Sequence, residues 1–291
     1  MTRDDLERSR RGWATHRVRL AYLRLASAIG LSPLRIPVPL ILLTGAAWAV
    51  MLHHAISMSA PMGSAGRGVL DDIQMFGNKA SLGGLGAFVA VWTVMMTAMM
   101  LPSAAPMILT FAAAQARRNH NDVAVPTWMF VMGYILVWAY AGFVVYLLLY
   151  AGKDLVDYLG WLESGAWAPL ALGITLTLAG LYQFTPLKHR GLRYCRSPSA
   201  FLLRHWRKDW QSAALEMGMS HGLYCLSCCW ALFGVMVAVG GMMSVAWMLV
   251  ITVVVFAERV LPYGQGISVA VAVGLIALGL LVGTGAVQLG G

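Results

Sequence analysis

The segment from Met217 to Ala257 constrains the fold most, because it contains no acidic or basic residue except His221. A helix that crosses a bilayer needs roughly 20 predominantly apolar residues, so this segment is long enough for two crossings. Charged residues make up only 11% of the chain, whereas soluble domains carry about a quarter. The sequence therefore excludes a water-soluble globular protein and predicts one that crosses the membrane several times.

Seven apolar runs of spanning length predict an all-α, polytopic transmembrane helical bundle. Pro102 and Pro106 fall inside the second run and predict a kink, and Gly240-Gly241 predicts the turn between the fifth and sixth runs. We expect a basic segment at 1–35, followed by one transmembrane domain at 36–291. The runs lie near 37–54, 86–114, 127–150, 168–187, 212–238, 243–259 and 267–288.

Lysine and arginine are distributed unevenly between the predicted loops. Of 21 such residues, 18 fall in the N-terminal segment and in alternate loops, including 188–208 and Arg259. The positive-inside rule then predicts a cytoplasmic N-terminus and an external C-terminus. These cations border the spans and do not alternate with aromatic residues on a folded surface. They therefore indicate contact with the lipid bilayer, and we expect no nucleic-acid partner.

Methionines are concentrated in the second predicted span. Met95 and Met99 are neighbours on one helical face, as are Met96 and Met100, and Met107 follows after the two prolines. Thioethers are soft ligands that suit Cu(I). The alternative is structural, because methionine also fills irregular gaps beside kinks.

The fifth predicted span carries a second group of soft ligands. On a helix, Met217, His221, Cys225, Cys228 and Cys229 share about a third of the circumference. Thiolate, thioether and imidazole together suit Cu(I) best, with zinc next. Buried cysteine can equally be a small hydrophobic residue. Gly218 and Gly222 flank His221 and predict close approach of another helix.

Two carboxylates lie at the predicted cytoplasmic ends of the uncharged segment. Glu216 is expected to pair with a basic residue such as Lys208, or to help a cation enter or leave on the inner side. Glu258 is expected to neutralise its neighbour Arg259. Cys195, in the basic loop, is a candidate acceptor thiol or a solvated cysteine without a role.

Several of these motifs, in this order, resemble one bacterial family. They are MMTAMMLPSAAPM (95–107), LKHRGLRYCRSP (187–198), EMGMSHGLYCLSCCW (216–230) and the glutamate–arginine pair at 258–259. The resemblance, over about 85–260, is to the DUF2182 family of predicted metal-binding integral membrane proteins, sometimes described as copper chaperones. Gly191 stands where that family's loop carries the first of two cysteines, so Cys195 needs a partner from elsewhere.

The resemblance implies a multi-pass protein of the bacterial inner membrane that handles copper with a metal donor or acceptor protein. Its motif positions match Met95, Met96, Met99, Met100, Pro102, Cys195, Glu216, Met217, His221, Cys225, Cys228 and Cys229.

Three functional hypotheses remain open at this point. The first is Cu(I) binding and delivery through the methionine, cysteine and histidine side chains and Glu216. The second is thiol–disulfide exchange at the Cys225/Cys228 pair, which has C-x-x-C spacing. The third is a purely structural subunit. We expect a binding protein rather than an enzyme, because no hydrolase or phosphate-binding motif is present.

Overall fold

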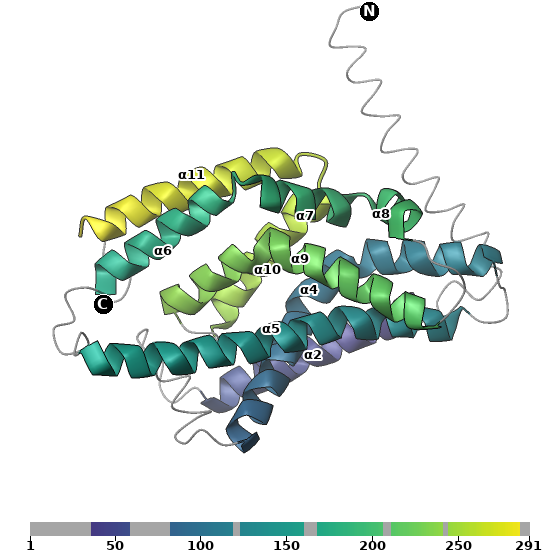
Figure 1. The fold of residues 1–291 in the computed structure, drawn as a ribbon, viewed down its shortest axis with the longest axis horizontal. Helices are drawn as coiled ribbons and strands as arrows, with labels where there is room; N and C mark the ends of the chain where they lie inside the picture. Colours follow the sequence, from purple (N-terminus) through teal and green to yellow (C-terminus); the bar gives the residue numbers. More distant parts are fainter. Residues whose placement is uncertain are drawn as a thin grey trace, which may run out of the picture.

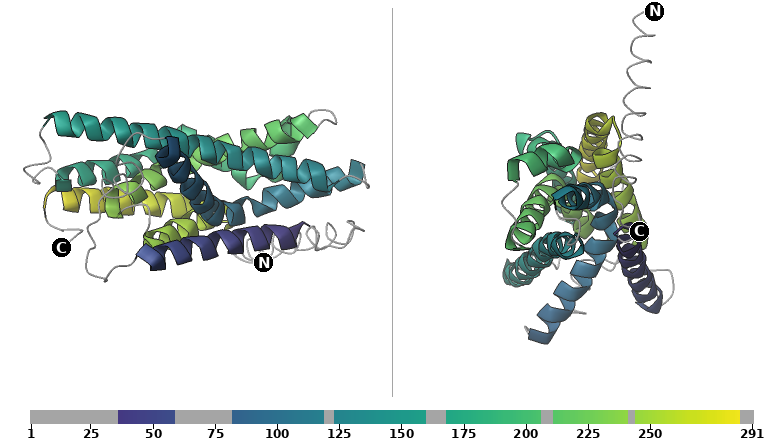
Figure 2. Two further views of the ribbon diagram at one scale, coloured as in Figure 1. Left: turned by 90° about the horizontal axis from the view of Figure 1, so that it is seen from below. Right: turned by 90° about the vertical axis from the view of Figure 1, so that its right-hand side faces the viewer.

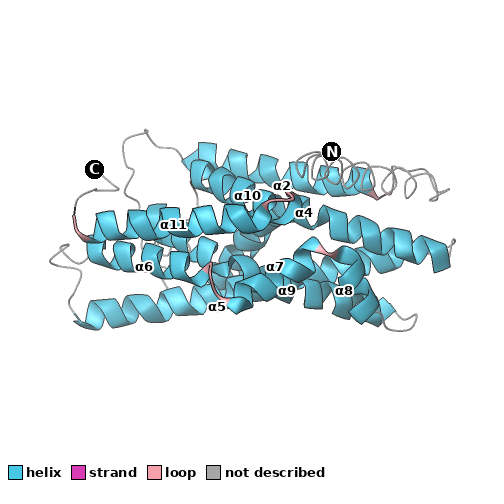
Figure 3. Cartoon of the chain, turned by 90° about the horizontal axis from the view of Figure 1, so that it is seen from above, coloured by secondary structure: helices cyan, strands magenta, loops and turns pink. Residues whose placement is uncertain are grey.

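The computed structural model describes residues 36–58, 82–118, 123–159, 168–205, 211–240 and 244–285, and every regular element within these ranges is a helix (Figure 3). The all-α expectation is therefore confirmed for the described chain, whereas the basic segment 1–35 lies outside it. The helices are α2 (Pro37–Met58), α4 (Leu82–Arg118), α5 (Ala124–Leu159), α6 (Ala168–Tyr182), α7 (Pro186–Arg196), α8 (Pro198–His205), α9 (Gln211–Gly240), α10 (Val245–Val260) and α11 (Gly264–Gly283).

Five of the described helices are long and apolar enough to cross a membrane, namely α2, α4, α5, α9 and α11. A sixth crossing results if α6 and α7, which are bent by 60° at their junction, count as one broken span. Helix α10 has 16 residues, so at 1.5 Å per residue it is several ångströms shorter than a hydrocarbon core of about 30 Å. The chain is built as a multi-pass membrane protein, but the expected count of seven spans is not confirmed.

The long helices run side by side, and both α9 and α4 pack against α5 (Figure 1). Helices α6 and α11 form a second closely packed pair, and α10 contacts α4, α9 and α11. Helix α4 is continuous through Pro102 and Pro106 but changes direction near its middle (Figure 2). The predicted kink is thus present, and the ring of each proline, which removes a backbone donor, explains it.

The predicted span at 168–187 is not one continuous helix, because the helix breaks after Tyr182 and resumes at Pro186 after a bend. Pro186 disfavours helical geometry at Thr185, whose backbone is extended, and the Thr185 hydroxyl accepts a bond from the Lys188 amide at the start of α7. Residues 188–208, expected to be a cytoplasmic loop, include α7 and α8, and α7 packs on α9. As a result Lys188 is buried, with 1% of its surface exposed.

Two glycines bring α9 unusually close to α5. A Cβ atom at Gly218 would collide with the carbonyl of Phe130, and one at Gly222 would lie 2.9 Å from the Cβ of Val137. Only a residue without a side chain fits these positions, which confirms the expected close approach beside His221. This contact places the inward face of α9 directly against the aromatic residues of α5.

Candidate metal centre

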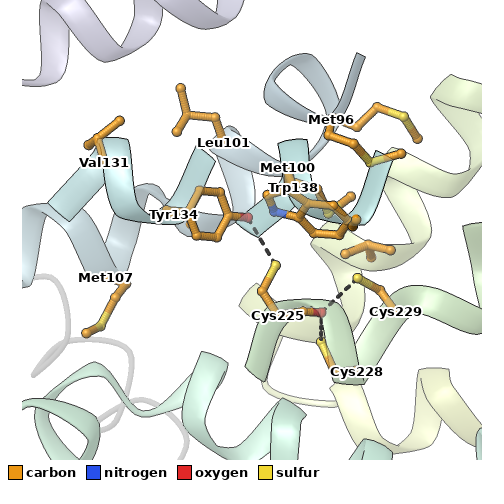
Figure 4. Packing of buried hydrophobic residues seen from close by; sticks show 14 of the residues in the cluster. Met96, Met100, Leu101, Met107, Val131, Tyr134, Trp138, Cys225, Cys228 and Cys229 are labelled. Carbon is orange, nitrogen blue, oxygen red and sulfur yellow. Dashed lines mark hydrogen bonds between the residues drawn. The ribbon is translucent and has the colours of Figure 1, made fainter. Parts of the chain in front are cut away.

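The three cysteines of α9 lie together on its buried side (Figure 4). Cys225, Cys228 and Cys229 are each at most 2% exposed. The thiols of Cys228 and Cys229 both donate to the carbonyl of Cys225, over 3.1 and 2.9 Å. Their spacing of three and four residues puts them one helical turn from Cys225 on the same face. The stripe expected from the sequence is therefore a compact group of sulfurs inside the bundle.

Cys195 approaches the same group from α7. Its side chain interacts with that of Cys228, and Gly191, one turn earlier, lies against α9. A Cβ atom at Gly191 would lie 3.1 Å from the Cβ of Cys228 and 2.7 Å from the carbonyl of Tyr224. The partner that Cys195 needed is thus a cysteine of α9, and all four sulfurs, none in a disulfide, belong to one site.

The side chain of Arg259 lies among these sulfurs, although it is only 5% exposed. Its Nη2 atom donates to Sγ of Cys225 at 2.9 Å, of Cys228 at 3.1 Å and of Cys229 at 3.5 Å. The same atom reaches the carbonyl of Cys225 at 3.3 Å, and Nη1 donates to the hydroxyl of Ser103 at 2.8 Å. One guanidinium therefore joins α9 and α4. Arg259, counted with the cytoplasmic cations on sequence grounds, is a buried residue at the C-terminal end of α10.

Glu258 does not neutralise Arg259, contrary to expectation. Both carboxylate oxygens of Glu258 accept hydrogen bonds from Nζ of Lys188, each over 2.8 Å. Lys188 also donates to the side-chain oxygen of Gln183, which lies in the turn between α6 and α7. Neighbouring helical residues point about 100° apart, so when Glu258 faces α7 its neighbour faces the cysteines. Because Glu258 pairs with Lys188, the guanidinium of Arg259 is available to donate to the cysteine sulfurs.

His221 lies one turn before Cys225 and is 1% exposed. Its ring is surrounded by those of Phe130, Tyr134 and Phe201, at centroid distances of 6.0, 5.7 and 5.5 Å. Its Nδ1 atom has no hydrogen-bond partner, which is unusual for a buried polar atom. The hydroxyl of Tyr134, in contrast, lies 3.0 Å from Sγ of Cys225. Tyr134 thus stands between the imidazole and the sulfurs.

The predicted methionines are all in the same buried cluster as the cysteines. Met95, Met96, Met99 and Met100 are at most 1% exposed. Helices α5 and α10 each contact both α4 and α9. At the site itself, α4 is connected to Arg259 through hydrogen bonds of Ser103. Ser103 accepts from Arg259 and donates to the carbonyl of Met100 over 2.9 Å. The methionines therefore share the buried core with the cysteines, and Ser103 links the backbone of Met100 to the guanidinium that contacts the sulfurs.

Two other predicted ligands differ in position. Met217 is 4% exposed and belongs to the core cluster. Glu216 is exposed on the surface of α9, because five residues at about 100° each place it nearly opposite His221. Glu216 therefore does not join the sulfurs.

Within the described ranges, no group of three or more His, Cys, Asp or Glu side chains is arranged to hold a metal ion. The structure thus lacks the four converging donors of a structural zinc site. It offers instead three cysteine sulfurs that accept hydrogen bonds from the guanidinium of Arg259, with methionine thioethers in the same buried cluster.

Sequence reasoning did not place Arg259, Lys188 or Tyr134 among the site residues, whereas helical spacing does put Ser103 on the same arc as the methionines of its span. A signal for the first two was present, because an ionisable residue at the end of an uncharged span is commonly buried and paired. The positive-inside argument assigned both residues to loops instead. Nothing in the sequence distinguishes Tyr134 from the other residues of its span.

No curated protein and no solved structure matches this chain. A family model described as PpoB2, copper chaperone, matches residues 89–282. The matched part extends from α4 into α11, so it contains the buried methionines, all four cysteines and Arg259. Because it covers more than half of the 291 residues, the chain belongs to the PpoB2 family of copper chaperones.

Proposed function

We propose that this protein binds copper as Cu(I) inside its helical bundle and exchanges it with a donor or acceptor protein. The observation that carries the proposal is that the three buried sulfurs of α9 share one nitrogen of Arg259, with the half-buried Cys195 of α7 beside Cys228. Membership of a copper chaperone family makes copper the cargo to consider first. Thiol–disulfide exchange has no comparable support.

The sulfurs of Cys225 and Cys228 are the proposed primary ligands. Both lie within 3.1 Å of the same Arg259 nitrogen, so small rotations bring them to one ion. Cu(I) is stable between two sulfur ligands, whereas zinc in proteins usually takes four. Cys229 and Cys195 are the next nearest thiols and could accept the ion in turn.

The buried methionines of α4 are proposed as a second set of weaker ligands. Their neutral thioethers belong to the same buried cluster as the cysteines and come from Met95, Met96, Met99 and Met100. Neutral soft ligands bind Cu(I) more weakly than thiolates, so the ion can be released again. His221 is a further candidate through Nδ1. Glu216, on the exposed side of α9, is proposed only as a residue along the entry or exit route. The proposed setting is the bacterial inner membrane.

The test is the copper content of the purified full-length protein. Wild type and the C225S/C228S/C229S variant are loaded with Cu(I) under reducing conditions, separated from free metal and analysed by mass spectrometry. M219L on the exposed side of α9 is the matched control, because it removes a sulfur outside the cluster. We expect stoichiometric copper in wild type and M219L and little in the serine variant. Equal, near-zero copper in all three would overturn the proposal.

A further inference from the structure

We infer that Arg259 makes this site selective for monovalent soft cations over divalent ones. The inference rests on the proposed function, since it concerns the ion held by the same sulfurs, and it assigns Arg259 a positioning and charge-selecting role. Among the predicted metal ligands, Arg259 forms hydrogen bonds only with cysteines. Among the described residues, Arg259 is the charged group in direct contact with the sulfurs of Cys225, Cys228 and Cys229.

The geometry fixes the distance over which this charge acts. Nη2 of Arg259 lies 2.9 to 3.5 Å from the three sulfurs, so an ion bound to two of them lies within a few ångströms of the guanidinium. The side chain is held on its other edge by Ser103. At 5% exposure there is little water to screen its field, and Coulomb interactions in such surroundings are much stronger than in water.

The guanidinium of Arg259 forms no direct ion pair with a carboxylate of the described residues. In the described part of the chain its hydrogen bonds go to sulfurs, to the carbonyl of Cys225 and to a hydroxyl. The carboxylate next to it in sequence, Glu258, is bound through both oxygens to Lys188. Both oxygens of this carboxylate are thus occupied by Lys188, so Glu258 forms its ion pair with Lys188 and not with Arg259.

A fixed positive charge repels a divalent ion twice as strongly as a monovalent ion at the same position. Two thiolates and one Cu(I) carry a net charge of −1, which the guanidinium balances. The same ligands around Zn(II) are already neutral, so the guanidinium then remains as an uncompensated buried charge, which is costly. Cu(I) and Zn(II) have the same number of electrons, so the pair tests charge with little change in electronic structure.

The experiment compares the affinities of the full-length protein for Cu(I) and Zn(II) by chelator competition, in wild type, R259M and R259K. Ag(I) and Cd(II) form a second pair that differs by one charge. We expect the ratio of Cu(I) to Zn(II) affinity to fall about 100-fold in R259M. It should stay within a few-fold of wild type in R259K, which keeps the charge. A purely structural role would change both affinities together and leave the ratio unaltered.

A second variant keeps the test valid if R259M does not fold. S103D places a carboxylate beside the guanidinium without removing it, and S103N is its isosteric neutral control. The affinity ratio should fall in S103D and not in S103N. The inference would be overturned if wild type binds Cu(I) but R259M has the same ratio of Cu(I) to Zn(II) affinity as wild type. If R259M does not fold, an unchanged ratio in S103D has the same meaning. Either result leaves the proposed function standing. Failure of wild type to bind Cu(I) would overturn the proposed function itself.

Discussion

Glu258 and Arg259 are adjacent in sequence, buried in the same helix end, and bonded to different partners. The carboxylate meets Lys188 of α7, and the guanidinium meets the sulfurs of α9. A buried charge without a partner is strongly destabilising, so each side chain must point toward its own partner. Because the two residues are adjacent on one helix, the direction of one fixes the direction of the other. The contacts of Arg259 with the cysteines therefore depend on the ion pair formed by the neighbouring residue on an adjacent face of the same helix.

At the residue scale, we predict that Y134F weakens the fold slightly and locally. The change removes the hydroxyl that lies 3.0 Å from Sγ of Cys225 but keeps the ring beside His221. Loss of one buried hydrogen bond should lower the free energy of unfolding by about 1 kcal/mol. Thermal or chemical unfolding in detergent measures it. The control is Y140F on the same helix, where Tyr140 is 67% exposed. Equal effects of the two changes would contradict the prediction.

Helical periodicity predicted the inward face of α9 but not what that face contacts. Met217, His221 and the three cysteines are all buried as a stripe, and the same periodicity would have excluded Glu216. The role of Arg259 could not be predicted in this way, because it depends on α10 ending level with the middle of α9. Only packing determines that level, and single-sequence patterns do not encode it.

At the element scale, the Lys188–Glu258 pair fastens α7 to α10. Removing one partner leaves the other charge buried, so K188M and E258Q should each lower the free energy of unfolding by about 3 to 5 kcal/mol. In K188M/E258Q neither charge remains, and the cost should be well below the sum of the two. A double-mutant cycle on the unfolding free energies measures the coupling. Strictly additive effects would show that the pair does not fasten the helices.

The close contact of α5 and α9 gives a second element-scale prediction. In G218A the new Cβ would collide with the Phe130 carbonyl, so the helices must separate. We expect a loss of about 1 to 3 kcal/mol in unfolding free energy, as for other overpacked sites. Gly234 of the same helix has open space around the corresponding position. G234A should therefore be neutral or slightly stabilising, and destabilisation of similar size in both variants would refute the packing argument.

Hydropathy located the long helices well because each contains an apolar run of spanning length. It failed for the region after α6, where a run of basic residues was taken as a loop. That region contains α7 and α8, and α7 buries Lys188 and Leu192 against the bundle. The Thr185-Pro186 sequence was an available signal for the new helix start, since Pro is favoured in the first helical turn. The burial of Lys188 was not predictable, because it requires Glu258 from a distant segment.

For the whole molecule, the number of spans depends on whether α10 crosses the membrane. Its 16 residues give a length of about 24 Å, and both of its final charged side chains are buried in the bundle. We predict that α10 still crosses with its neighbours, because a short span can be accommodated by local thinning of the bilayer. The crossings that follow the 119–122 segment are then α5, the α6–α7 broken span, α9, α10 and α11. An odd number of crossings places that segment and the C-terminus on opposite sides.

Reporters in the otherwise full-length protein test this arrangement. Green fluorescent protein folds and fluoresces on the cytoplasmic side, and alkaline phosphatase is active on the outer side. Arg117 and Arg118 precede the 119–122 segment, so the positive-inside rule predicts fluorescence for an insertion there. Phosphatase activity is expected for a C-terminal fusion. Fluorescence at both positions would mean that α10 does not cross but enters and leaves on the outer side, where α9 ends, and would contradict the prediction.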